Sequence, residues 1–193
     1  MKVIALTGTA LADALPDVAR LRIAVFRDWP YLYDGDLAYE ERYLQSYRSS
    51  AQAIVVGAYD GDTLVGASTG TPLTDHADDF AAAFATTGIN LSEVFYCAES
   101  VLLPSYRGRG IGHAFVDKRE AHARAFGYSK SCFCAVNREG EHVAKPENYR
   151  PLDPFWRSRG YAPLDGVVAS FSWKDVGASA ETAKKLQVWM RDL

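Results

Sequence analysis

A glycine-rich turn, Arg107–Gly112, lies between two segments of clear character and limits the folds that this chain can adopt. The run before it, Val94–Leu103, is almost continuously apolar, which is typical of a strand buried on both faces, and Pro104 ends that strand. The segment after it, Ile111–Phe126, has apolar residues at helical spacing and ends at Gly127. The sequence therefore predicts a buried strand that passes through a tight turn directly into a helix.

This turn has the properties of an anion-binding site. Gly108, Gly110 and Gly112 remove side chains where backbone N–H groups can point at a ligand lying across the start of the helix. The partial positive charge of a helix N-terminus favours an anion, and Arg107 and Arg109 add to it. A pyrophosphate group is the ligand that we expect here.

Two other phosphate-binding motifs do not match this turn. A P-loop has Lys and then Ser or Thr after its last glycine, whereas Gly112 is followed by His113. The dinucleotide-binding motif places its third glycine one position later and an acidic residue at the end of the next strand, but the next strand predicted here ends at Val136 and Asn137. Hydrolysis of ATP or GTP is therefore disfavoured, and a nucleotide-dependent oxidoreductase is kept as an alternative.

Around the turn, the sequence predicts strands mixed with helices, hence an α/β protein with a mixed sheet and helices on its faces. The residues Asp60-Gly61-Asp62 predict a hairpin between two of the strands, and Asn137–Asp153 predicts a long loop. The predicted strands are Val3–Thr7, Ala53–Tyr59, Thr63–Thr71, Val94–Leu103, Lys130–Val136 and Val167–Trp173, and the predicted helices are Asp13–Phe26, Leu37–Tyr47, Asp78–Thr87, Ile111–Phe126, Phe155–Arg159 and a terminal helix Thr182–Met190.

The composition argues against several classes of partner. A formal net charge of −3 gives no general affinity for nucleic acid, and no apolar run approaches the roughly 20 residues that a membrane-spanning helix needs. The three cysteines, Cys97, Cys132 and Cys134, are an odd number without the spacing of a disulfide framework. We therefore expect a cytoplasmic protein that binds neither nucleic acid nor membranes, with residues 1–193 as a single domain.

The turn resembles the R/Q-x-x-G-x-G/A signature of the GNAT superfamily of acyl-CoA-dependent N-acyltransferases. The preceding Leu102–Gly108 is similar to the strand exit of that family, and Phe155–Tyr161 is similar to its F-Y-x-x-x-G-F segment. The resemblance implies a mixed, largely antiparallel sheet of six to seven strands that is splayed at its central strand, with helices on both faces. It also implies transfer of an acetyl group from acetyl-CoA to a primary amine of a small molecule or peptide, by direct attack in a ternary complex.

The resemblance further implies how acetyl-CoA, as co-substrate, is held. Backbone groups of Leu102 and Leu103 would pair with the pantetheine arm, and Trp156 would line it or bond to the sulfur. The pyrophosphate would be bound by the turn residues Arg107, Gly108, Arg109, Gly110, Ile111, Gly112 and His113. No metal is expected.

Acyl transfer to an amine needs a proton acceptor, because most alkylamines are ammonium ions at pH 7. Glu99 lies within the apolar run of the central strand, and desolvation makes a carboxylate a better proton acceptor. Acidic residues at this strand position serve as base in several members of the resembled family. We therefore predict that Glu99 is the base or the amine anchor; the alternative is an ion pair with a nearby Arg or Lys.

The departing thiolate also needs a proton donor. Members of the family use the tyrosine of the F-Y pair, but Trp156 occupies that position and an indole N–H is no acid at neutral pH. We predict Tyr149 in this role, with Tyr161 or a water as alternatives. Because of Trp156, a non-catalytic module that only binds coenzyme A also stays open.

The acceptor amine is predicted to bind near the aromatic and acidic stretch between the first two helices, through Tyr31, Tyr33 and Asp34. Aromatic rings interleaved with carboxylates attract a cation. A solvated acidic helix start with core aromatics would give the same pattern. Neither the identity of the amine nor a homodimer can be decided from these residues.

The remaining reactive side chains are predicted to be mainly structural. Cys132 and Cys134 share a strand face and are expected to be buried core thiols. Cys97 is placed on the same strand side as Glu99 by the period of two, so it is expected near the cleft. Three histidines are predicted at the surface: His76, His122 and His142.

Overall fold

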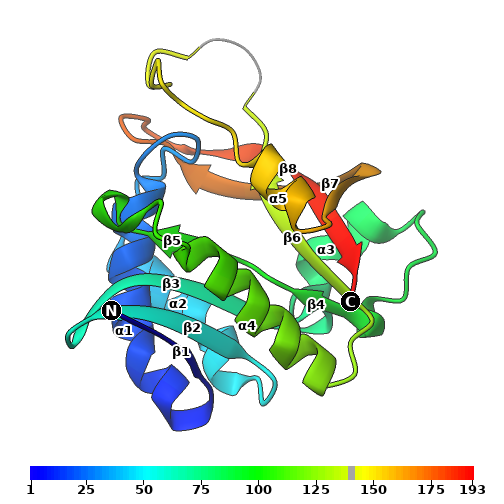
Figure 1. Ribbon diagram of the computed structural model, residues 1–193. Helices are drawn as coiled ribbons and strands as arrows, with labels where there is room; N and C mark the ends of the chain where they lie inside the picture. The colour runs from blue at the N-terminus through cyan, green and yellow to red at the C-terminus, as the bar shows by residue number, and fades with distance from the viewer. Residues whose placement is uncertain (139–141) are drawn as a thin grey trace.

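The computed structural model describes residues 1–138 and 142–193, in which eight strands form one sheet with helices on both faces (Figure 1). The predicted loop Asn137–Asp153 includes residues 139–141, which lie outside the described residues. The strands are β1 (Lys2–Leu6), β2 (Ile54–Asp60), β3 (Thr63–Pro72), β4 (Val94–Tyr96), β5 (Ser100–Leu102), β6 (Lys130–Val136), β7 (Ala162–Lys174) and β8 (Glu181–Asp192). The helices are α1 (Gly8–Phe26), α2 (Leu37–Ser49), α3 (Ala77–Phe84), α4 (Ile111–Ala125) and α5 (Asp153–Ser158), with short 3₁₀ turns η1 (Leu73–His76), η2 (Leu91–Glu93) and η3 (Pro104–Tyr106).

The strand order is β1-β2-β3-β4-β6-β8-β7, and β5 lies off this path as a second partner of β3. The β4–β6 pair is parallel and the other pairs are antiparallel. The mixed, largely antiparallel sheet predicted from the sequence is therefore confirmed. The sheet has more strands than expected because the run Val94–Leu103 forms two strands and the C-terminal segment adds one.

The prediction of a terminal helix at Thr182–Met190 is wrong. This segment is strand β8, which lies between β6 and β7 and pairs with both. Its buried residues Lys184, Leu186 and Val188 alternate with more exposed ones, which is the period of two that a strand requires. Two neighbouring strands stabilise this segment by cross-strand contacts that a local pattern does not reveal.

Alternate residues of the central strands pack on opposite faces of the sheet. Val55 of β2 belongs to a buried cluster with α1 and α2, whereas Ile54 and Val56 pack with Ile111 and Phe115 of α4. Figure 1 shows α4 crossing the face opposite to α1 and α2. The two sides of the sheet are thus covered by different helices, and consecutive residues of a strand pack against different helices.

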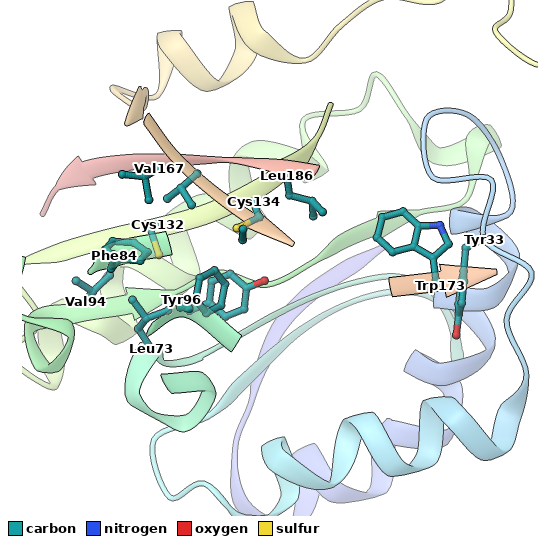
Figure 2. Close-up of a cluster of buried hydrophobic side chains, with 13 residues drawn as sticks. Tyr33, Leu73, Phe84, Val94, Tyr96, Cys132, Cys134, Val167, Trp173 and Leu186 are labelled. Atoms are coloured by element: carbon teal, nitrogen blue, oxygen red, sulfur yellow. The ribbon is translucent and has the colours of Figure 1, made fainter. Parts of the chain in front are cut away.

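Helix α3 covers the other half of the sheet. Its Phe80 and Phe84 belong to a buried cluster with residues of β4, β6, β7 and β8, among them Cys132, Val167 and Val188 (Figure 2). The amphipathic segment predicted at Asp78–Thr87 therefore serves as a core element between β4 and β7.

The sheet separates at its centre. The N–H of Cys97 donates to the carbonyl of Cys132 at 2.8 Å, which continues the β4–β6 pairing by one residue. Beyond this point β5 pairs with β3, and β6 pairs with β8. The splay implied by the family resemblance is therefore present, between β5 and β6.

Helix α4 contributes a side chain to this point of separation. The guanidinium of Arg119, which is 6% exposed, donates from Nη1 to the carbonyl oxygens of Thr69 at 3.2 Å and Glu99 at 3.0 Å. The carbonyl of Glu99 also accepts the N–H of Thr69 at 3.0 Å. The chain between β4 and β5 is thus fixed by β3 on one side and by α4 on the other.

Candidate functional site

The glycine turn has the backbone conformation that its sequence predicts. Gly108 has φ +74° and Gly110 has φ +78°, and both lie in the left-handed region where a side chain is strained. A Cβ atom at either position would meet no atom within 4 Å, so the surrounding space is open. Gly110 is the N-cap of α4 and Gly108 precedes it, so this open space lies at the N-terminus of the helix.

Five consecutive backbone amides, those of residues 108–112, have no hydrogen-bond acceptor within the described part of the chain. The two flanking amides are engaged: Arg107 N–H donates to the carbonyl of Pro104 at 3.2 Å, and His113 N–H donates to that of Gly110 at 3.1 Å. The expected contribution of these two amides to anion binding is therefore wrong, because both already have acceptors. The five amides between them form a cradle at a helix N-terminus that fits a pyrophosphate group.

The two arginines of the turn fix its shape and stay exposed. Arg107 donates from Nε to the carbonyl of Leu102 at 3.2 Å, and Arg109 donates from Nη2 to that of Ser105 at 2.8 Å. Each guanidinium has further N–H groups that can reach an anion. The exposed ring of His113 lies edge-on against Phe155, with ring centroids 5.0 Å apart.

The free edge of β5 is offered by Leu102 and not by Leu103. The N–H of Leu103 donates to the carbonyl of Val65 at 3.0 Å, and its carbonyl accepts the N–H of Tyr106 at 3.0 Å. The predicted pairing of Leu103 with a pantetheine arm is therefore wrong. Since backbone groups alternate along a strand, the N–H and C=O of Leu102 point to the opposite edge, which faces the splay. The C=O of Leu102 accepts Nε of Arg107, so its N–H is the group that this edge offers to a pantetheine arm.

Glu99 is buried at the splay, on the face that α1 and α2 cover, and it is ion-paired. Its Oε1 lies 2.5 Å from Nη1 of Arg22, and its Oε2 accepts the hydroxyl of Tyr43 at 3.3 Å. Arg22 also binds the carboxylate of Glu40, which is fully buried. Of the two interpretations left open by the sequence, the ion pair with an arginine is the one observed, although it does not exclude a role toward an amine.

The surroundings of this cluster keep Arg22 charged and Tyr43 neutral. Burial alone would lower the pKa of Arg22, but the carboxylates of Glu99 and Glu40 and the Tyr43 hydroxyl raise this pKa well above its usual value. Burial and then Glu99 raise the pKa of Tyr43, so its hydroxyl stays a hydrogen-bond donor.

A cavity of about 100 Å³ opens next to Glu99. Tyr31 and Tyr33 line it, as predicted for an acceptor site, together with aromatic residues of α2, β4 and β7 such as Tyr43, Tyr96 and Trp173. Figure 2 shows Tyr33 beside Trp173 above α2. Burial raises the pKa of Tyr31 and of Tyr33 far above the usual value, so both rings stay neutral.

Asp34 does not line this cavity, and its predicted role in binding an amine is not supported. Its carboxylate accepts Nζ of Lys174 at 2.7 Å and Nη1 of Arg27 at 3.1 Å. These two hydrogen bonds lower the pKa of Asp34 below its ordinary value. Asp34 therefore attaches the α1–α2 loop to β7, which is a structural role.

The two aromatic residues predicted near the thioester lie in different surroundings. Tyr149 packs edge-on against Trp29, with ring centroids 6.1 Å apart, and it is not among the residues that line the cavity. Trp156 of α5 packs against Phe133 and Trp189, at ring-centroid distances of 5.0 and 5.1 Å. The placement of Tyr149 gives no support to its predicted role as proton donor.

The prediction that Cys97 faces the cleft is wrong. Cys97 packs with Phe95 and Phe115 under α4, and its Sγ lies 3.4 Å from Oγ of Ser131. The strand period of two is broken between β4 and β5: Ala98 lines the cavity, and so does the next residue, Glu99. A bulge of this kind reverses the face of every residue on one side of it.

Other reactive residues are buried. Cys132 and Cys134 are core thiols on one strand face, as predicted, and Cys134 also lines the cavity. Burial raises the pKa of Cys134 to about 12, which keeps it a thiol and argues against a covalent mechanism. His76 is 9% exposed and lies near the rings of three tyrosines, so its predicted surface position is wrong.

Sequence reasoning missed the residue that organises this site. Arg22 occupies a core-facing position of α1, among residues of the buried face such as Leu15, Val18 and Ala19. The sequence does contain a signal for this residue: a single arginine within the apolar face of a helix indicates a buried ion pair, because a buried charge requires a partner. Glu40 carries the same signal in α2, where it is buried with Leu44 and Tyr47.

A splayed sheet with free amides at a helix start and a buried carboxylate at the head of the splay defines an acyltransferase that uses coenzyme A. The family described as Acetyltransferase (GNAT) matches residues 16–145, which are more than half of the chain, and the chain belongs to this family. Its members transfer an acyl group from acetyl-CoA. No curated protein matches the chain.

Solved structures with the same fold are distant in sequence. The chain is similar to a ribosomal-protein-alanine N-acetyltransferase from Brucella melitensis, with 14% identity, TM-score 0.62 and full coverage of both chains. It is also similar to the PaiA N-acetyltransferase from Thermoplasma acidophilum in complex with coenzyme A, with 13% identity, TM-score 0.55 and full coverage of both chains. An acetyltransferase from Thermus thermophilus has 14% identity and TM-score 0.58, with 100% of this chain and 98% of that chain covered. At these identities the likeness concerns the fold.

Among the helices of residues 1–138 and 142–193, none is both long enough and apolar enough to cross a membrane.

Proposed function

We propose that this protein transfers an acetyl group from acetyl-CoA to a primary amine of a small molecule or peptide, by direct attack in a ternary complex. The observation that carries the proposal is the pairing of two half-sites along one splay. Five amides without an acceptor among the described residues lie at the start of α4, and a buried carboxylate, Glu99, lies directly before β5.

The residues present fit the co-substrate. The amides of residues 108–112, with Arg107 and Arg109, would hold the pyrophosphate, and the edge of Leu102 would pair with the pantetheine arm. Trp156 packs against Phe133 and Trp189 and is not among the residues that line the cavity, so it is given no role toward the sulfur. When bound, acetyl-CoA supplies an activated thioester carbonyl next to the cavity.

Glu99 is assigned two tasks on the acceptor side. Its negative charge attracts the ammonium form of the amine, and its carboxylate accepts the proton, directly or through a water, that the amine must lose before attack. Arg22 fixes the orientation of the Glu99 carboxylate through their ion pair. Tyr149 is not given the role of proton donor to the thiolate, because it packs against Trp29 away from the cavity lining. Tyr161 is buried with its hydroxyl bonded to Ser131 and Glu120, so the departing thiolate takes its proton from water.

The test is release of coenzyme A thiol from acetyl-CoA in the presence of primary amines, for the parent and for Glu99→Gln. We expect amine-dependent thiol release that falls on the order of 100-fold in Glu99→Gln, with unchanged affinity for coenzyme A. Equal turnover in both proteins would remove Glu99 from the mechanism.

The Arg22–Glu99 ion pair and the presence of Trp156 instead of tyrosine favour one other candidate, a module that binds coenzyme A without catalysis. That protein would bind coenzyme A and release no thiol with any amine. The same assay therefore separates the two functions.

A further inference from the structure

We infer that the acceptor cavity selects amines that carry no carboxylate next to the amino group, and that the buried triad Glu40–Arg22–Glu99 sets this selectivity. The inference rests on the proposed function and names the class of amine that the site accepts. That class is the end of an uncharged alkyl chain bearing a single ammonium group.

The triad combines two carboxylate groups with one guanidinium group, which is a formal net charge of −1. Arg22 stands between the two carboxylates, with Nη1 2.5 Å from Oε1 of Glu99 and with Nε bonded to Oε2 of Glu40. All three side chains are buried: Glu40 is 0%, Glu99 5% and Arg22 8% exposed. Oε1 of Glu40 has no hydrogen-bond partner among the described residues. One guanidinium therefore faces two carboxylates in a place where water screens poorly.

Within the described residues that line the cavity, Arg22 is the one cation. Three cations outside the lining have carboxylate partners of their own: Lys184 and Arg138 share Asp175 at 3.4 and 2.7 Å, and Lys174 pairs with Asp34 at 2.7 Å. Lys184 also lies 5.3 Å from the ring of Trp173, but none of these three cations lines the cavity. Among the described lining residues, no cation other than Arg22 is thus present to pair with a carboxylate of the acceptor, and the hydroxyl groups that line the cavity carry no charge to offset it.

The guanidinium of Arg22 already has two carboxylate partners, through Nε and Nη1. It also lies 4.2 Å from the ring centroid of Tyr43 and 5.2 Å from that of Phe26. The other aromatic rings that line the cavity are those of Tyr31, Tyr33, Tyr39, Tyr96, Phe171 and Trp173. Their faces carry negative potential, so they attract an ammonium ion, repel a carboxylate and pack against methylene groups.

The size of the cavity limits the part of the acceptor that enters it. At about 100 Å³ it is several times smaller than the roughly 300–1,000 Å³ of most ligand pockets. It therefore encloses the end of a chain and leaves the remainder of a larger molecule outside. A carboxylate two bonds from the nitrogen would have to enter with the ammonium group and would meet the net negative triad.

The experiment compares norvaline with norvalinamide, which differ by a carboxylate against a neutral amide of nearly the same shape. Each is titrated by calorimetry at pH 7 into the protein with and without saturating coenzyme A, and n-butylamine is titrated as the parent chain. We expect norvalinamide and n-butylamine to bind at least tenfold more tightly than norvaline. Equal binding of norvaline and norvalinamide, preference for norvaline, or no binding of either probe would overturn the inference.

Two variants test the triad. Glu40→Gln removes one negative charge at a residue that lies behind Arg22 and outside the cavity lining, so the preference for norvalinamide is expected to fall below threefold. The matched control is Glu41→Gln, the exposed neighbour on α2, which should keep the parent preference. An unchanged preference in Glu40→Gln would overturn the role of the triad.

Two further readouts keep the outcomes separate. If Glu40→Gln does not fold, Glu99→Gln removes the other carboxylate and should reduce the same preference. If coenzyme A does not bind to the parent protein, the proposed function fails, whereas a preference for norvalinamide in the protein without coenzyme A still supports the charge inference.

Discussion

Placing a carboxylate at Gly110 tests the anion cradle most directly. Gly110→Asp sets a negative charge at the N-cap of α4, in space that is open in the protein, so no steric clash accompanies the change. At about 5 Å from a pyrophosphate charge, with an effective dielectric constant of about 20, the repulsion is about 3 kcal/mol. We therefore expect coenzyme A to bind on the order of 100-fold more weakly.

Gly127→Asp is the matched control for this variant. Gly127 lies just beyond the other end of α4, also has a positive φ (+84°) and also has no atom within 4 Å of an added Cβ. The backbone strain of about 1–2 kcal/mol is the same in both variants, but an aspartate favours a helix N-cap and disfavours a C-terminus. Gly127→Asp should thus be the less stable protein and yet bind coenzyme A normally.

Isothermal titration calorimetry with coenzyme A measures the affinity, and thermal unfolding measures the stability. The reasoning fails if Gly110→Asp binds coenzyme A within threefold of the parent protein. It also fails if Gly127→Asp loses as much affinity as Gly110→Asp, because the loss would then reflect the helix and not the cradle.

Three further outcomes follow from the site. Glu99→Gln should lower amine-dependent thiol release on the order of 100-fold at unchanged coenzyme A affinity, and equal rates would refute its catalytic role. Lys174 and Arg27 lower the pKa of Asp34, so the stability that Asp34 contributes is present above its unfolded pKa of about 4 and is lost as the pH falls through its folded pKa. Below pH 4, the Tm of Asp34→Asn should therefore fall less steeply with decreasing pH than the Tm of the parent protein. Parallel curves of Tm against pH would contradict this. Cys134, with a pKa raised to about 12, should resist iodoacetamide at pH 8 in the folded protein and react after denaturation, as mass spectrometry of the modified peptide would show; rapid labelling of the folded protein would refute its burial.

The local signals in the sequence were sufficient for the cofactor half of the site. The apolar run, Pro104, the glycines and the periodicity of Ile111–Phe126 all act over a few residues, so the turn and α4 could be predicted with good bounds, whereas the predicted strand Val94–Leu103 is divided into β4 and β5. Within the turn, the amides of Arg107 and His113 are taken by carbonyls three residues earlier, a detail of turn geometry that the glycine spacing does not specify.

The acceptor half depends on contacts between distant segments, and there the predictions were less successful. Asp34 was predicted to bind the amine because it follows two tyrosines in the sequence, but its carboxylate is paired with Lys174, which lies 140 residues later in the chain. Cys97 was assigned to the wrong face because the strand was read as continuous, while the bulge before β5 depends on Thr69 and Arg119. The terminal strand β8 likewise owes its conformation to neighbours that lie far away along the chain.

The hydrogen bond from Arg119 to the carbonyl of Glu99 gives α4 a second duty. The same helix begins at Gly110, nine residues or about 13 Å before Arg119 along its axis. Because an α-helix is stiff over this length, a displacement of the first turn of α4 also displaces Arg119 and, through its hydrogen bond, the main chain of Glu99. The proposed phosphate-binding turn and the proposed proton acceptor, Glu99, are therefore attached to the same rigid helix.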